Sequence, residues 1–313
     1  AVDMKGGVAA FLGALRALDA AGAEPRSFRL ALVPDEEIGG PLGADVVRRY
    51  GPLSDEMWVL EPGQPADGGE TVVLGRWGLV TWSLDARGVA AHSGLDFERG
   101  RSALAAAARW VDRAQALSEP DLASVNAAAF ISPATPPTSQ GPLSDEPPPL
   151  NVVPESASVG GEVRFAERAV GDRVLDALRI LAEQVSADTG VELRFTVHEE
   201  IPAYAATQTT TESAWLARRF AAAEACGLRL EIEASRRGVS FSNFVPPTPQ
   251  PLRVLDGLGP VGGGMHTEQE WVSLESLHRR TAWLARMLID PTGKLYSEYE
   301  DCDLNSRPHL RVR

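Results

Sequence analysis

The chain has 313 residues and a formal net charge of −13, with 44% hydrophobic and 23% charged residues. This length supports a large core and favours two domains, and the acidic balance argues against binding to nucleic-acid phosphates or to an anionic membrane surface. No run of 18 apolar residues predicts a membrane-spanning helix, and two cysteines are too few for a disulfide framework or a cysteine-rich zinc module. Any metal chemistry must therefore use histidines and carboxylates.

The first part of the chain alternates strands and helices. Residues 1–3 are typical of the end of a buried strand, so we expect the chain to lack an N-terminal piece of its first domain. Helices are expected at residues 8–18 and 42–49, and strands at 28–33 and 57–60. This alternation predicts an open α/β sheet, which binds its ligands at the C-terminal ends of the strands.

The pattern changes near residue 70. Residues 71–74 and 79–86 alternate apolar and polar side chains, like an antiparallel pair. A helix is expected next, followed by a strand, a second helix and a further strand; their ranges are 102–117, 159–165, 173–187 and 191–197. These elements predict a small α+β domain inserted into the first one. Residues 133–149 hold seven prolines, which favours an extended loop.

The helix and strand alternation returns after Pro202. We expect helices at 212–225 and 274–288 and strands at 229–234 and 253–255, while residues 296–313 lack periodicity and predict a tail. We predict a first catalytic part at residues 1–76, an inserted domain at 77–198, a second catalytic part at 199–290 and a tail at 291–313.

Carboxylates follow three of the predicted strands. Asp3, the triplet 35–37 and Glu61 each stand just past a strand end, where an open α/β sheet places its ligands. Hydrolysis of an amide at neutral pH needs a nucleophilic water, a proton acceptor and a group that stabilises the oxyanion, and two zinc ions held by carboxylates and imidazoles supply the first and the last. The adjacent Glu36 and Glu37 can divide the remaining work, one as a metal ligand and the other as a general base.

Two histidines lie in glycine-rich loops that suit a site. His266 follows Gly262–Gly264, and His92 precedes Ser93 and Gly94. The other histidines, His198, His278 and His309, have no such setting and are expected at the surface.

Each of these residues also has an ordinary structural interpretation. Asp3 can cap the following helix, and the triplet 35–37 can be a solvated helix N-terminus. Glu61 can be a turn residue, Arg164 can form a surface ion pair, and histidines in loops are more often packing residues than ligands. Only the joint order and spacing of these residues favour a site over these alternatives.

A set of motifs in one order resembles the M20 family of di-zinc metallopeptidases, in particular its glutamate carboxypeptidase, acetylornithine deacetylase and succinyl-diaminopimelate desuccinylase branch. The motifs are Val-Asp-Met-Lys-Gly-Gly at residues 2–7, Pro-Asp-Glu-Glu-Ile-Gly at 34–39, Glu-Pro-Gly at 61–63, Gly-Arg-Trp-Gly at 75–78, Gly-Val-Ala-Ala-His-Ser-Gly at 88–94, Asn-Val-Val-Pro at 151–154, Gly-Glu-Val-Arg at 161–164, and Leu-Asp-Gly-Leu-Gly-Pro at 255–260, which runs into Gly-Gly-Gly-Met-His at 262–266. The resemblance implies an open-sheet zinc-peptidase catalytic domain with an inserted ferredoxin-like lid and dimerisation domain.

The resemblance also implies a role for each matching residue. Asp3 would bridge two Zn²⁺ ions, with Glu37 and His266 completing one metal site and Glu61 binding the other metal. Co²⁺ or Mn²⁺ are possible substitutes. Glu36 would be the general base, and His92 would reach the site of a partner subunit and stabilise the oxyanion. Asn151 and Arg164 would bind the carboxylate of the substrate, and the Asp3–Met4 peptide would be cis.

Three features depart from the family pattern. The His-x-Asp motif that precedes the bridging Asp has no counterpart in this chain, so the Glu61 metal has only Asp3 and Glu61 as protein ligands. We therefore expect a weakened or single-metal site, with low or absent activity. Phe241 stands where the family usually has Asp, so the loop around it is expected to lack a side chain that normally stabilises it. The proline-rich stretch before Asn151 is longer than usual.

Two functions follow as hypotheses. The first is a cytoplasmic metal-dependent hydrolase, a homodimer joined through the lid, that removes a C-terminal residue from a peptide or the acyl group from an N-acyl amino acid. The second is a non-catalytic homologue that retains dimerisation or small-ligand binding. Neither involves nucleic acid or a membrane.

Overall fold

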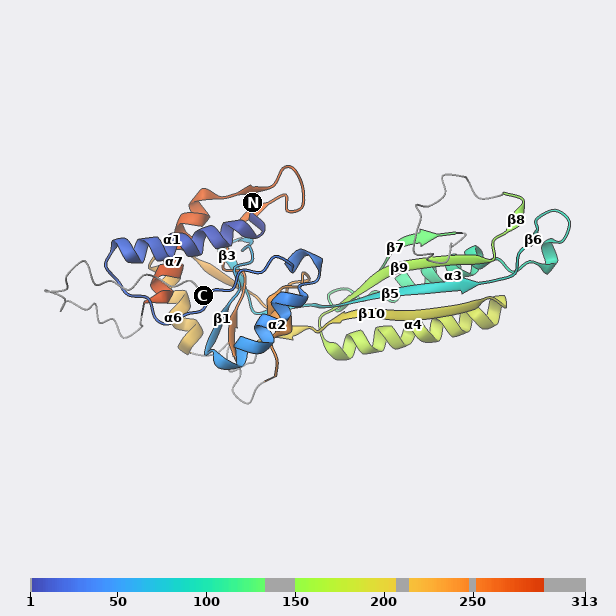
Figure 1. Cartoon of the computed structure of the whole chain (residues 1–313), viewed down its shortest axis with the longest axis horizontal. Helices are drawn as coiled ribbons and strands as arrows, with labels where there is room; N and C mark the ends of the chain where they lie inside the picture. Colours follow the sequence, from blue (N-terminus) through green and yellow to red (C-terminus); the bar gives the residue numbers. More distant parts are fainter. Residues whose placement is uncertain (1, 133–149, 207–213, 248–251, 290–313) are drawn as a thin grey trace.

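Two units of secondary structure, joined by two strand connections, make up the chain (Figure 1). The computed structural model describes residues 2–132, 150–206, 214–247 and 252–289. The proline-rich stretch at 133–149 and the expected tail at 291–313 therefore lie outside the described residues. None of the helices within the described ranges combines the length and the apolarity needed to cross a membrane.

The first unit contains helices packed on short strands. Its helices are α1 (Gly7–Ala20), α2 (Pro41–Tyr50), α6 (Ala214–Glu224) and α7 (Leu274–Leu288). Its strands are β1 (Glu56–Trp58), β2 (Pro65–Ala66), β3 (Gly69–Val73), β4 (Gly75–Arg76), β11 (Tyr204–Ala205), β12 (Leu230–Glu233), β13 (Arg253–Leu255), β14 (Gly262–Gly263) and β15 (Trp271–Val272). The pairs β1–β13 and β3–β12 are parallel, as an α/β unit requires.

Helix α1 lies against α7 and shares with it one apolar core. Ala10, Ala14 and Trp283 are buried in this core. Small residues on α1 let the two helices approach closely, and the indole of Trp283 fills the space between them and α6, where its Nε1–H donates to the Arg219 carbonyl at 2.9 Å.

The second unit is an antiparallel sheet with two helices on one face. It contains β5 (Gly78–Arg87), α3 (Ala103–Gln115), β7 (Ala123–Ile131), β9 (Ser156–Phe165), α4 (Arg168–Thr189) and β10 (Glu192–Ile201), with the short pair β6 (Ala91–His92) and β8 (Val152–Val153) at its far end. The strand order is β10-β5-β9-β7, and all neighbours are antiparallel. Short turns complete the chain at η1 (Val2–Gly6), η2 (Glu36–Ile38), η3 (Gly51–Leu53), η4 (Phe97–Arg99) and η5 (Phe241–Phe244).

Strand β5 shows why one face of this sheet is covered and the other open. Its residues alternate strictly, with Val80, Trp82 and Leu84 buried under α3 and α4. Trp82 meets Trp110 of α3 edge to face, with ring centroids 5.2 Å apart. The intervening Thr81 and Ser83 are polar and partly exposed on the opposite face, which is therefore free to meet solvent or a ligand.

Most predicted elements are confirmed within a few residues. The predicted helices correspond to α1, α2, α3, α4, α6 and α7, and the predicted strands at 57–60, 159–165, 191–197, 229–234 and 253–255 correspond to β1, β9, β10, β12 and β13. Strand β7 was not predicted, and β10 continues through residue 198 to Ile201.

Two predicted strands near the N-terminus are wrong. Of the strand end expected at residues 1–3, the structure describes Val2 and Asp3, which instead begin η1, a helical stretch interrupted by non-helical backbone at Asp3 and Met4. Residues 28–33 belong to no sheet, and their backbone makes no hydrogen bond to another described residue. A strand requires a neighbouring strand, and Phe28 and Leu32 remain 39% and 65% exposed without one.

The predicted pairing of residues 71–74 with 79–86 is also wrong. Strand β3 pairs with β12 and β2 in the first unit, whereas β5 lies between β9 and β10 in the second. The glycines at 75 and 78 do not form a hairpin; they lie where the chain passes from one unit to the other (Figure 1).

Candidate active site

Three of the predicted metal ligands converge on one point. Asp3 comes from η1, Glu37 from η2 and His266 from the loop after β14. The His266 Nε2 atom lies 3.1 Å from Asp3 Oδ2 and 3.5 Å from Glu37 Oε2, and one ligand atom from each of the three lies within 4.8 Å of the others. Segments more than 200 residues apart thus supply one set of oxygen and nitrogen donors.

The backbone around Asp3 explains how it reaches this point. The Asp3–Met4 peptide is cis, as the resemblance predicts. The Asp3 N–H donates to Glu270 Oε1 at 3.0 Å. Gly7 lets α1 begin against the β1 connection, because a Cβ atom there would lie only 2.0 Å from the Leu60 carbonyl oxygen. These contacts fix the backbone that carries Asp3.

Glu36 lies next to Asp3, Glu37 and His266, but its carboxylate is not one of the converging ligands. Burial, followed by the charges of Glu37 and Asp3, raises its pKa to about 7. A carboxyl group with a pKa near neutrality is suited to accept and release a proton at physiological pH. Asp35, by contrast, has a structural role, since its Oδ2 accepts the Leu42 N–H at 2.6 Å and caps the start of α2.

Glu61 is buried, close enough to Asp3 for their charges to interact. Its residue surface is 8% exposed, and its Oε1 has no hydrogen-bond partner among the described residues. Burial, followed by the charges of Asp256 and Glu36, raises its pKa to about 8. A buried carboxylate oxygen without a donor is costly, so this position favours a cation or a proton.

A buried ion pair that the sequence did not single out lies behind these carboxylates. Arg76 Nε and Nη2 donate to Asp256 Oδ2 and Oδ1, both at 2.8 Å, and Asp256 also accepts the Ser240 and Ser242 hydroxyls at 2.6 and 2.5 Å. Burial opposes the ionisation of Asp256, but Arg76 outweighs it, and the pKa of Asp256 is lowered. The motifs at 75–78 and 255–260 contain both residues, but sequence alone does not show that they meet.

The loop that carries Phe241 is well supported despite the missing Asp. Ser240 and Asn243 form a capping box around η5, and the Asn243 amide donates to the Trp77 and Pro202 carbonyls at 3.0 and 2.8 Å. The Phe241 ring packs over Gly43 of α2. The loop therefore bridges the first unit and both connections to the second.

His92 and Asn151 do not join the Asp3 group. They lie at the far end of the second unit, at β6 and beside β8 (Figure 1), where the Ser93 N–H donates to the Asn151 carbonyl at 2.9 Å. His92 Nδ1 accepts the Gly94 and Leu95 N–H groups at 3.1 and 3.2 Å. In the neutral ring the proton is therefore on Nε2, which faces outward as a donor because His92 is exposed.

Arg164 lies at the opposite end of the same sheet, next to the first unit. Its Nε and Nη2 donate to Glu162 at 2.8 and 3.2 Å, and its Nη1 donates to the Arg237 carbonyl at 3.1 Å. Because a guanidinium has five N–H donors, two remain available to an incoming carboxylate.

The remaining histidines that the structure describes are exposed, as predicted. His198 contacts Ser83 Oγ at 2.9 Å, and His278 lies on the outside of α7. His309 falls outside the described residues.

The donor set fits a divalent transition metal. Two carboxylates and an imidazole are ligands that zinc accepts, and burial, together with the charges of neighbouring carboxylates, raises the pKa values of Glu36 and Glu61. A bound cation relieves this repulsion.

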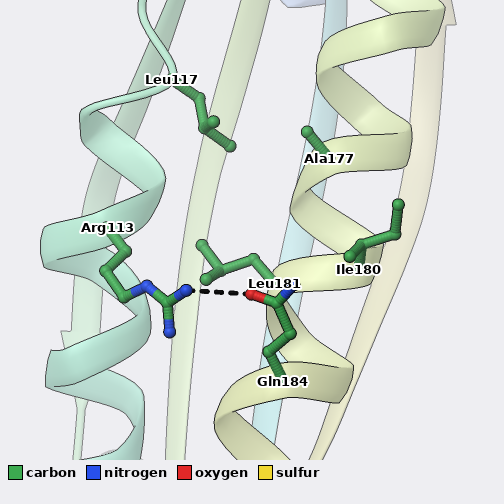
Figure 2. Close-up of a pocket in the computed structure, with 6 residues that line it drawn as sticks. All are labelled: Arg113, Leu117, Ala177, Ile180, Leu181 and Gln184. Carbon is green, nitrogen blue, oxygen red and sulfur yellow. Dashed lines mark hydrogen bonds between the residues drawn. The ribbon is translucent and has the colours of Figure 1, made fainter.

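A shallow hollow of about 280 Å³ lies elsewhere, between α3 and α4 on the helical face of the second unit (Figure 2). Arg113 Nη2 donates to Gln184 Oε1 at 2.9 Å across it. Its walls are mostly apolar and contain no group suited to the chemistry of the Asp3 cluster.

Comparison with known proteins gives a consistent result. A model of peptidase family M20/M25/M40 matches residues 1–290. The chain is 28% identical to a succinyl-diaminopimelate desuccinylase of Dinoroseobacter shibae over 93% of this chain and 73% of that protein. It is 25% identical to carboxypeptidase G2 of a Pseudomonas species over 92% of this chain and 65% of that protein. A tripeptidase structure from Staphylococcus aureus superimposes with a TM-score of 0.73 at 20% identity, covering 92% of this chain and 70% of that one.

Proposed function

Because the chain belongs to peptidase family M20/M25/M40, we propose that it is a metal-dependent hydrolase of amide bonds that stand next to a free carboxylate. Its substrate is a peptide, cut as by a carboxypeptidase, or an N-acyl amino acid, cut as by a deacylase. The relatives named as a desuccinylase and a carboxypeptidase support this substrate class. The convergence of Asp3, Glu37 and His266 carries the proposal.

In this proposal Asp3, Glu37 and His266 would hold one Zn²⁺, and Asp3 and Glu61 would contribute to a second site. Zinc supplies Lewis acidity, which acidifies water and polarises a carbonyl oxygen. Glu36 takes a proton from the attacking water and delivers it to the nitrogen of the leaving amine. Arg164 binds the substrate carboxylate through its two remaining N–H donors.

We propose that the second unit is a lid and dimerisation domain. His92 belongs to β6 and Asn151 precedes β8, and this strand pair lies at the end of the second unit away from the first (Figure 1), so both residues serve the site of a second copy. Strand β7 supports this assembly because it is an edge strand whose Phe130 and Ile131 are 41% and 44% exposed. The lid corresponds to residues 77–198 and the catalytic domain to the parts on either side. A cytoplasmic location remains a prediction.

One observation favours a second candidate function, a non-catalytic homologue that binds a small ligand. The group of three converging ligands does not include Glu61, so among the described residues the second metal has only Asp3 and Glu61. Metal analysis separates the two candidates, because a chain that retains no zinc after dialysis favours the second.

The test of the hydrolase proposal separates metal binding from proton transfer. The purified chain is loaded with Zn²⁺, and its hydrolysis of a panel of N-acyl amino acids and dipeptides is measured. The variant E36Q should retain zinc and lose about 10²–10⁴ in kcat, because only the general base is removed. The variant H266A should lose zinc, while H278A, which removes an exposed histidine, should match the original chain. An E36Q variant with undiminished kcat would contradict the assignment.

Subunit complementation tests the role of His92. The variants E36Q and H92A should each be inactive, but a heterodimer has one site with Glu36 from one chain and His92 from the other. Full exchange in an equal mixture should therefore restore about a quarter of the original activity. A mixture that stays inactive while subunits demonstrably exchange would overturn the assembly.

A further inference from the structure

One loop contacts Asp3 at two places. Strands β14 and β15 form an antiparallel hairpin, and residues 264–270 connect them. His266 lies near the middle of this loop, where its Nε2 atom is 3.1 Å from Asp3 Oδ2. Glu270 ends the loop, and its Oε1 accepts the Asp3 N–H at 3.0 Å. The side chain and the backbone of Asp3 are therefore held by the same short segment.

Hydrogen bonds within the loop tie Glu270 to the turn that carries His266. The Thr267 N–H and hydroxyl both donate to the Gly264 carbonyl, at 3.1 and 2.7 Å. The Glu270 N–H donates in turn to the Thr267 carbonyl at 3.3 Å. Gly264 and His266 have φ angles of 68° and 64°, and this left-handed backbone turns the chain sharply. The loop therefore sets where His266 and Glu270 lie relative to each other.

The base of the hairpin packs against the segment that carries Asp3. Val2 is fully buried, and a Cβ atom on Gly262 would lie 2.7 Å from its Cγ2. The first N–H groups of a helical stretch need acceptors from outside it, and the partly buried Glu270 supplies the acceptor for Asp3. The contact between hairpin and η1 thus includes a side chain whose reach fixes the Asp3 backbone.

Glu270 is not one of the converging ligands. The group that could hold an ion contains Asp3, Glu37 and His266 only, and Glu270 contacts the backbone of one of them. Groups that orient a metal ligand without binding the metal typically change metal affinity by about 10–100-fold when they are removed.

We propose that Glu270 is a positioning residue for the metal site. By accepting the Asp3 N–H, it keeps the Asp3 carboxylate beside His266, so that both can bind one cation. The inference rests on the proposed function, since it takes the same metal site. A residue that acted only through its charge would depend on that charge, whereas a positioning residue depends on the reach of its side chain.

Two conservative variants separate reach from charge. E270Q keeps the length of the side chain and an acceptor oxygen but removes the charge, whereas E270D keeps the charge but is shorter by one CH₂ group. Zinc affinity is measured by competition with a chromophoric chelator. E270A and E270D should each weaken zinc binding by about 10–100-fold. E270Q should stay within about fivefold of the original chain, because a neutral amide oxygen accepts the same N–H, although more weakly.

Two controls accompany these variants. E268A removes an exposed carboxylate from the same loop and should leave zinc affinity unchanged. Urea unfolding of the zinc-free chains should give similar midpoints for E270Q and E270D, which separates a loss of zinc from a loss of the fold.

An unchanged zinc affinity in E270A or E270D, or a loss in E270Q as large as that in E270D, would overturn the proposal while leaving the hydrolase assignment intact. An original chain that binds no zinc would overturn both. The expected order of zinc affinities in a chain that hydrolyses no substrate would support Glu270 and refute only the hydrolase assignment.

Discussion

Removal of the buried charge of Asp256 should destabilise the protein more than most single changes. The side chains of Arg76 and Asp256 are 4% and 2% exposed and meet through two hydrogen bonds of 2.8 Å. The variant D256N keeps the shape of the side chain but removes the charged partner that accepts both of these hydrogen bonds from the buried Arg76 guanidinium. Breaking such a pair costs about 3–5 kcal/mol, a large part of the 5–15 kcal/mol by which a domain is typically stable.

Urea unfolding followed by tryptophan fluorescence measures this cost. The transition midpoint of D256N should move to lower urea with an unchanged slope, because the change affects the native state and not the surface exposed on unfolding. S242A is the graded control, since it removes one hydroxyl hydrogen bond to Asp256 and should cost about 1–2 kcal/mol. The double variant R76M/D256L should be more stable than D256N, because replacing both charges removes the uncompensated one.

A D256N variant that loses less than about 1 kcal/mol would refute this reasoning, because a dry Arg76 cannot be left unpaired at so small a cost. A double variant that is less stable than D256N would also contradict it, since it would show that the pair contributes favourable energy beyond avoiding an unpaired charge.

Three further changes test other parts of the structure. Burial opposes the ionisation of Glu56, but the contacts of this carboxylate with Arg26 and Arg219 outweigh burial and lower its pKa from 4.5 to about 2. The ionised carboxylate should therefore add about 3 kcal/mol to the free energy of unfolding above pH 5, and this contribution should disappear as the pH falls towards 2. The melting temperatures of E56Q and the original chain should thus differ at pH 7 and converge in acid. A Cβ atom on Gly43 would lie 2.1 Å from Cε1 of Phe241, so G43A should cost about 1–3 kcal/mol in urea unfolding in spite of its better helix propensity, and a smaller residue at 241 should recover it. W110A should cost about 3–5 kcal/mol by the same measurement, because this side chain is fully buried.

Local sequence was sufficient for elements whose boundaries are set by their own residues. The predicted helix at 274–288 has the bounds of α7, because Ser273 caps it by accepting the Ser276 N–H at 3.2 Å and its apolar residues repeat with the helical period. Residues 28–33 show the opposite case. Their alternation is that of a strand, but a strand also depends on a neighbour that local sequence does not reveal.

The residues of the candidate site were also only partly predictable from local sequence. Motifs in the first unit identified Asp3, Glu37 and His266, which the structure brings together. The partnership of Arg76 with Asp256 was missed because 180 residues separate them. His92 lies far from Asp3 because β5 is long, and none of the sequence motifs predicts the length of this strand.

The charges around the candidate site favour the binding of a cation from outside the chain. The charge of the buried Arg76 lowers the pKa of both Glu36 and Glu61, but Arg76 is committed to Asp256 by two short hydrogen bonds, so it only partly offsets the repulsion among the other carboxylates. Burial and this repulsion together raise the pKa of Glu36 to about 7 and that of Glu61 to about 8. Two protons or a divalent cation can neutralise the excess, but only the cation leaves Glu36 ionised and able to accept a proton. If Glu36 is the general base that we propose, binding of a cation and ionisation of Glu36 are coupled, and a change that weakens one should weaken the other.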